Sequence, residues 1–157
     1  MKLKKFMSII MAVVATSTFC TISALAGTDP EVKLTTAATT VKAGEEFTVD
    51  VSIANNPGIV SLYLNVDATN DNFTLVSVED KKMSGVAGIL DSDYTKADYM
   101  LQWWYDDTFS TDNTSNGTVA TLTYKVNEGV ANGTYAINIA CDADNTYCAA
   151  GDPVDFG

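Results

Sequence analysis

Two stretches of alternating residues, separated by a Pro-Gly turn, constrain the fold of this chain most strongly. Residues 46–54 and 61–67 each alternate apolar and polar side chains along their whole length. The apolar members are Phe47, Val49, Val51 and Ile53 in the first stretch and Leu62, Leu64 and Val66 in the second. Strict period-2 alternation is typical of strands that are buried on one side. Pro57 and Gly58 lie between the two stretches, and this pair favours a turn.

Similar short strands, each followed by a turn signal, recur along most of the chain. They are expected at residues 32–36, 73–78, 89–94, 99–106, 118–126 and 134–141, and a last strand begins at 154–156. Residues 79–88 and 107–117 are polar and are expected to be loops. Many short strands with turn chemistry between them predict an all-β fold, a two-sheet antiparallel β-sandwich whose inner faces form the core.

The first 26 residues have the features of a secretory signal peptide. Lysines near the start are followed by the apolar run 6–14 and by Ala24-Leu25-Ala26, which fits an A-x-A cleavage site. The apolar run is too short to span a bilayer. We therefore expect a signal peptide at residues 1–26 and one secreted domain at residues 27–157, exported by a bacterium to the extracellular space or the cell surface. That length suits a single domain.

Composition excludes several classes of function. The chain has 20 acidic residues against 9 basic ones, a net charge of −11, and no histidine. Ser-His-Asp and Cys-His nucleophile systems, and zinc sites of the usual kinds, therefore cannot be built. Nucleic acid and anionic membranes would be repelled by this charge. The expected activity is binding rather than catalysis, because the commonest general base is missing.

Two cysteines, Cys141 and Cys148, lie in the predicted domain. In an exported protein a pair at this spacing can close a small disulfide loop. Two free thiols are the alternative, and sequence alone does not decide between them.

Two long stretches resemble the cohesins, the modules of cellulosome scaffold proteins that bind dockerins. The first reads VKAGEEFTVDVSIANNPGIVSLYLNVD and the second reads NGTVATLTYKVNEGVANGTYAINI. The resemblance implies a nine-stranded sandwich of jelly-roll topology. It also implies a partner, a small helical dockerin carried by a polysaccharide-degrading enzyme or a scaffold protein. Calcium is expected in the dockerin and no cofactor in this chain. The last strand of cohesins usually continues, so we expect the natural protein to extend beyond Gly157.

In cohesins the partner lies across one sheet, over strands that correspond here to 61–67, 89–94, 99–106 and 134–141. The resemblance implies contact by the outward residues Ser61, Tyr63 and Asn65, and an exposed aromatic at Tyr94. On 134–141 the outward positions are Ala136, Asn138 and Ala140. Tyr63 is the natural anchor, since exposed aromatic side chains are enriched at protein interfaces.

The aromatic stretch 99–106 has two possible orientations. One face holds Tyr99, Leu101, Trp103 and Tyr105, and the other holds Met100, Gln102, Trp104 and Asp106. Burying an unpaired amide or carboxylate is costly. We therefore expect Leu101 and Trp103 in the core, with Met100, Gln102 and Trp104 facing outward toward the partner.

Three other functions fit the sequence less well. A carbohydrate-binding module is the main alternative, because Tyr63, Trp103, Trp104 and Tyr105 could stack on sugars. A calcium loop at 142–145 lacks the glycine and glutamate that such loops require. Asp106 and Asp107 are adjacent, so on a strand they point to opposite faces and cannot act as the paired acids of a glycosidase.

Overall fold

The computed structural model describes the chain at residues 12–17 (backbone only), 29–38, 40–67, 71–81, 98–105 and 108–156. These residues form eight strands and two four-stranded sheets, packed face to face. The predicted all-β, two-sheet sandwich is confirmed. The expected strand at 89–94, and with it Tyr94, lies outside the described residues, as do Asp106 and Asp107.

One sheet has the order β2-β3-β7-β5, formed by Glu31–Thr35, Glu46–Ala54, Gly117–Val126 and Phe73–Asp80. All its pairings are antiparallel. The alternation predicted for β3 is observed: Phe47, Val49, Val51 and Ile53 are buried and the residues between them are exposed or half-buried. Residues 79 and 80, expected in a loop, extend β5 because they pair with Thr121 and Ala120 of β7.

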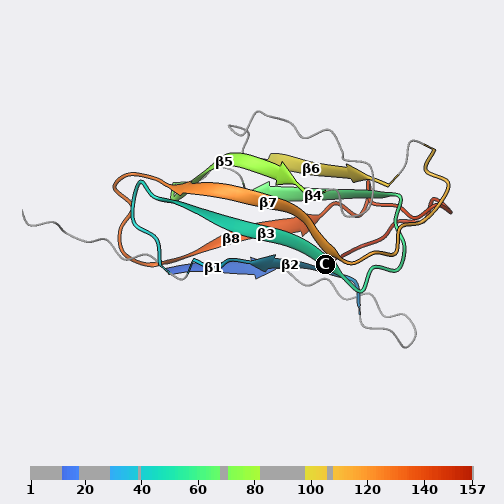
Figure 1. The fold of residues 1–157 in the computed structure, drawn as a ribbon, viewed down its shortest axis with the longest axis horizontal. Coiled ribbons are helices and arrows are strands. Elements are labelled where there is room, and N and C mark those ends of the chain that lie inside the picture. Colours follow the sequence, from blue (N-terminus) through green and yellow to red (C-terminus); the bar gives the residue numbers. More distant parts are fainter. Residues whose placement is uncertain are drawn as a thin grey trace, which may run out of the picture.

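The other sheet has the order β1-β8-β4-β6, formed by Ala12–Ser17, Thr134–Cys141, Ser61–Asp67 and Asp98–Trp104. Strand β4 lies between β6 and β8 and pairs antiparallel with both. Figure 1 shows the two sheets as layers that follow the long axis of the molecule, with β4 and β6 in one layer and β3 and β7 in the other.

Strand β1 comes from the segment in which the sequence predicts a signal peptide. It pairs in parallel with β8, from Ala12 opposite Thr134 to Ser17 opposite Ile139. In the whole chain this segment forms an edge strand, and its removal with the signal peptide stays a prediction. Every other strand pairing among the described residues is antiparallel. The described core side chains all lie between Val32 and Phe156.

Both sheets contribute to the core. Phe47, Phe73 and Tyr124 form an aromatic cluster with ring centroids 5.7–6.3 Å apart. Leu62, Leu64 and Val66 of β4 face them from the opposite sheet and are fully buried. Phe156 closes the core near the chain end, and its carbonyl accepts a 3.1 Å hydrogen bond from the Val32 amide. The Val154 amide also donates to the Thr146 carbonyl at 2.8 Å, so two backbone hydrogen bonds hold the segment 154–156, which is not a regular strand in the structure.

The predicted turn after β3 is fixed by a buried asparagine. Asn56 donates from Nδ2 to the carbonyls of Asn113 and Ser115, each at 2.9 Å, and its Oδ1 accepts from the Gly58 amide at 3.0 Å. Gly58 has a φ of +124°, which favours glycine. The 113–116 segment is thereby held against the turn. At the same end of the sandwich, the Val60 amide donates to the Tyr147 carbonyl at 2.8 Å.

Candidate functional site

The candidate site is the solvent-facing side of the sheet β8-β4-β6, which we call the outer face. Register aligns its side chains in rows: Gln102 lies opposite Tyr63, and Met100 and Ala140 lie on either side of Asn65. Successive side chains of a strand point to opposite faces, so these residues share the face that Leu62, Leu64 and Val66 do not occupy. The outer face consists of Tyr63, Asn65, Met100, Gln102, Trp104, Ala136, Asn138 and Ala140, each half-buried or exposed.

The two tryptophans of β6 face in opposite directions, as predicted. Trp103 is 4% exposed and lies in the core with Leu101, whereas Trp104 is half-buried on the outer face. Tyr105 stacks on Trp103, with ring centroids 6.4 Å apart and planes 18° apart. Trp103 is therefore not accessible to a sugar. Of the four residues considered for sugar stacking, Trp104 and Tyr63 lie on the outer face.

Tyr63 and Trp104 form an edge-to-face pair on this surface. Their ring centroids are 6.2 Å apart and their planes meet at 80°. Edge-to-face geometry is favourable for aromatic rings because the positive edge of one meets the negative face of the other. The pair makes a corner rather than the flat platform on which sugar rings stack.

Ser61 was expected to face outward, but the structure shows that it is buried. It is 4% exposed, because the segment 145–147 covers it. Its Oγ donates to the Asn145 carbonyl at 3.1 Å and accepts from the Tyr147 amide at 3.2 Å. Ser61 therefore holds the loop after β8 in place and is unavailable to a partner.

That loop also encloses the first cysteine. Cys141 and Cys148 are both free, the second of the two alternatives left open by the sequence. Burial is the main cause that raises the pKa of the Cys141 thiol, and Asp155 and Asp142 raise it further. Hydrogen bonds with the Phe156 backbone and the Thr146 side chain act in the opposite direction and lower it. Thr146 is completely buried and accepts at Oγ1 from the Tyr63 amide at 3.0 Å.

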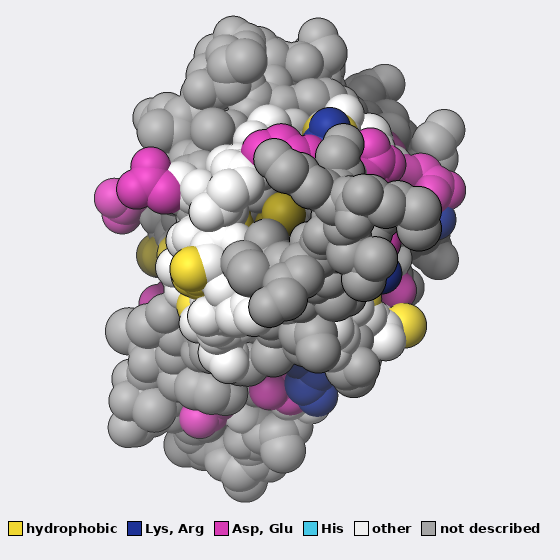
Figure 2. Space-filling model, turned by 90° about the vertical axis from the view of Figure 1, so that its left-hand side faces the viewer, with side chains coloured by type: hydrophobic (Ala, Val, Ile, Leu, Met, Phe, Trp, Pro, Cys, Tyr) yellow, Lys and Arg dark blue, Asp and Glu magenta, His cyan; other side chains and the backbone are white. Residues whose placement is uncertain are grey.

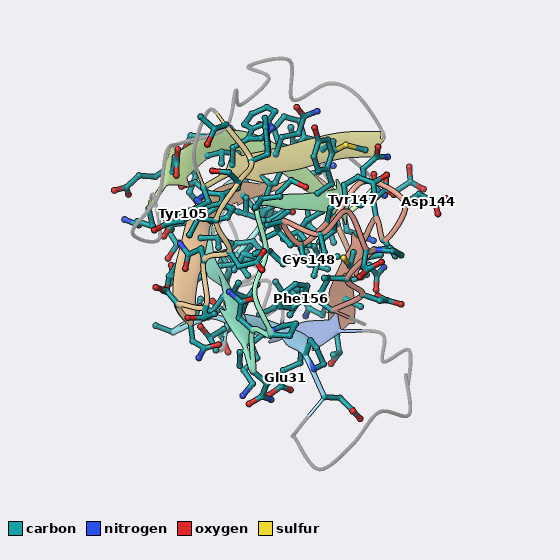
Figure 3. The ribbon with its side chains drawn as sticks, turned by 90° about the vertical axis from the view of Figure 1, so that its right-hand side faces the viewer. Glu31, Tyr105, Asp144, Tyr147, Cys148 and Phe156 are labelled. Carbon is teal, nitrogen blue, oxygen red and sulfur yellow. The ribbon has the colours of Figure 1, made fainter. Side chains whose placement is uncertain are left out.

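Two functional candidates escaped the sequence analysis. Phe109 and Tyr147 are the exposed large hydrophobic side chains among the described residues, at 43% and 36% exposure. Each is an isolated aromatic in a polar loop, and that isolation is the signal that could have identified them. Both line a depression of about 400 Å³ together with Tyr63 and Trp104. Figure 3 looks onto this end of the sandwich, with Tyr147 and Cys148 on the loop after β8.

Charge is distributed unevenly between the two sheets. Lys33, Lys42 and Lys81 each pair with a glutamate on the β2-β3-β7-β5 side. The outer face, as defined above from the described residues, contains no lysine or arginine. Figure 2 shows the end of the sandwich opposite to Figure 3, where acidic side chains are spread over the described surface. The described part of the chain contains no group of three or more His, Cys, Asp and Glu placed to hold a metal ion.

Within the described residues, no helix has the length and apolar character needed to cross a membrane. Comparison with curated proteins gives no match to the chain. The model of the cohesin domain matches residues 30–146, which span every strand described here except β1.

Solved structures show the same fold. A cohesin in a cohesin–dockerin complex of Clostridium thermocellum is similar with a TM-score of 0.61 and 15% identity, covering 85% of this chain and 91% of that one. The sixth cohesin of scaffoldin B from Acetivibrio cellulolyticus, solved with a dockerin, gives 0.57 and 19%, covering 83% and 94%. A non-cellulosomal cohesin of the archaeon Archaeoglobus fulgidus gives 0.50 and 12%, covering 82% and 84%. With the family model matching most of its length, this chain belongs to the cohesin domain family.

Proposed function

We propose that this chain is a protein-binding module, not an enzyme, and that its outer face binds a dockerin. The family supports this proposal, since solved relatives include cohesins in complex with dockerins. The observation that carries it is the Tyr63–Trp104 pair, two aromatic rings side by side on a surface whose other residues, apart from Met100, are small or polar. Buried aromatic anchors supply much of the binding energy at protein interfaces.

The remaining outer-face residues suit a helix as the partner. Ala136 and Ala140 are small and exposed on β8, so a helix backbone can approach the sheet closely there. Asn65, Gln102 and Asn138 offer amide groups that can fix the register of the helix by hydrogen bonds. Met100 adds a flexible apolar contact between them. Because the strands already hold these side chains, binding requires little ordering.

The cohesin family and the predicted signal peptide together support a role outside the cell. The signal peptide predicted at residues 1–26 would export the protein to the extracellular space or the cell surface. There the module would recruit polysaccharide-degrading enzymes or scaffold subunits whose dockerins fold around calcium. Assembly into a cellulosome is the proposed outcome, although a non-cellulosomal cohesin is among the similar structures.

Calorimetric titration with purified dockerins tests the proposal. We expect saturable binding of at least one calcium-loaded dockerin, and loss of that binding when a chelator removes the calcium. Binding to none of a broad panel would contradict the proposed function. Saturable binding of cellohexaose without a protein partner would instead support the carbohydrate-binding alternative.

A further inference from the structure

The aromatic depression lies beside the proposed interface and is continuous with it. Tyr63 and Trp104 belong to the outer face and also line the depression. Phe109 comes from the loop between β6 and β7, and Tyr147 comes from the loop after β8. Two loops and two strands thus bring four aromatic side chains to one concave surface at the end of the sheet.

Three polar side chains around this surface, Ser61, Asn145 and Tyr147, are hydrogen-bonded within the chain. Ser61 Oγ is bonded to the Asn145 carbonyl and the Tyr147 amide. Asn145 Nδ2 donates to Asp142 Oδ2 at 3.0 Å, and the Tyr147 hydroxyl donates to the Asp144 carbonyl. The depression therefore presents mainly carbon to an incoming group, which favours an apolar side chain over a ligand rich in hydroxyls.

Hydrogen bonds hold together the two loops that line the depression. Asp112 Oδ1 accepts a 2.6 Å hydrogen bond from the Ala149 amide, which ties the Phe109 loop to the Tyr147 loop. Ile59 pairs with Asn113, and the Val60 amide donates to the Tyr147 carbonyl, so both loops are also tied to the turn before β4. A preformed apolar recess costs a partner little conformational entropy.

We propose that this depression receives one large apolar side chain of the dockerin, a leucine, methionine or phenylalanine next to the helix that lies on the outer face. This inference rests on the proposed function and adds a second point of attachment to it. The helix contacts Tyr63 and Trp104 from the sheet side, and the apolar side chain enters between Trp104, Phe109 and Tyr147. Phe109 and Tyr147 then determine which dockerins bind, because they shape the recess.

A sugar is a poorer occupant of the same recess. Sugar rings stack on flat aromatic surfaces, whereas Tyr63 and Trp104 meet at 80°. A sugar also requires several free hydrogen-bonding groups, and Ser61 and the side-chain amide of Asn145 are engaged within the chain. Exposed apolar surface of this kind is typical of protein interaction sites.

The test compares Phe109→Ala and Tyr147→Ala with the unchanged chain by calorimetric titration against the calcium-loaded dockerin that binds the unchanged chain best. We expect each substitution to weaken binding at least tenfold, and Phe109→Leu and Tyr147→Phe to retain most of it. Thr48→Ala, at an exposed position on the other sheet, is the control and should not change affinity. Thermal unfolding of each variant checks that the sandwich is intact.

The outcomes separate the two proposals. Unchanged binding in both alanine variants would overturn the proposed role of the depression, but it would not affect the proposal that the outer face binds a dockerin. Absence of dockerin binding by the unchanged chain would overturn both. Saturable cellohexaose binding that Phe109→Ala abolishes would assign the recess to a sugar and overturn the inference.

Discussion

Trp103 and Trp104 are neighbours in the sequence and lie on opposite faces of β6. Trp103 is in the core beside Leu101, and Trp104 is on the outer face beside Tyr63. Because successive side chains of a strand point to opposite faces, one of these two identical side chains is buried in the core and the other is on the surface. The pair is therefore a matched internal comparison for stability and for binding.

The two tryptophans should differ sharply in their contribution to stability. We expect Trp103→Ala to lower the free energy of unfolding by about 3–5 kcal/mol, because it leaves a large cavity between the sheets. Trp104→Ala should cost about 0.5–1.5 kcal/mol, the range for losing one aromatic pair. Urea denaturation of both variants measures the difference. Equal losses would contradict the assigned faces of β6.

Thr146 should stabilise the loop after β8 through its hydroxyl. Thr146→Val keeps the shape but removes the acceptor for the Tyr63 amide, which then stays buried without this partner. We expect a loss of about 1–3 kcal/mol in the free energy of unfolding and faster hydrogen exchange at that amide. The exposed Thr48→Val is the control, expected within about 0.5 kcal/mol of the unchanged chain. A Thr146 variant as stable as the control would show that the bond contributes nothing.

The two cysteines should differ in reactivity. The thiolate is the reactive form, and burial raises the pKa of Cys141, so little of it is deprotonated near pH 8. Iodoacetamide is therefore expected to label Cys148 before Cys141, with the Cys141 rate rising as the pH increases. Peptide mass spectrometry after brief labelling measures the order, and labelling in urea is the control in which the preference disappears. Faster labelling of Cys141 in the folded chain would contradict the burial that raises its pKa.

The leader should be removed on export. Expression of the whole chain in a secreting bacterial host is expected to yield a protein that begins at Gly27, since the cleavage pattern ends at Ala26. This processing would remove β1 and leave every described core side chain in place. Intact-mass measurement of the secreted protein gives the answer. If the secreted protein retains Met1, the signal peptide is not cleaved and β1 remains part of the protein.

Much of the fold could be predicted from local pattern. The bounds of β3, β4 and β8 agree with the sequence-based ranges, because alternation over seven or more residues leaves one register that buries the apolar side chains. The orientation of β6 followed from the cost of burying Gln102. That β4, β6 and β8 share one sheet was predicted only from the resemblance to cohesins. Local pattern does not reveal strand order, because strand order depends on contacts between distant segments.

The site was harder to predict because its surroundings come from loops. Ser61 has the alternation of an outward residue, and only the return of the chain at 145–147 buries it. Phe109 and Tyr147 lie in segments without periodicity, so nothing local indicates that they meet at one depression. The pairing of β1 with β8 was missed for a different reason. The same apolar residues that mark a signal peptide also suit an edge strand.

The most direct test of the central claim is the affinity of Trp104→Ala for a dockerin that binds the unchanged chain, measured by calorimetric titration in calcium. If the outer face is the interface, the substitution should weaken binding by about 2–4 kcal/mol while the domain stays folded. An affinity equal to that of the unchanged chain would show that the dockerin binds elsewhere.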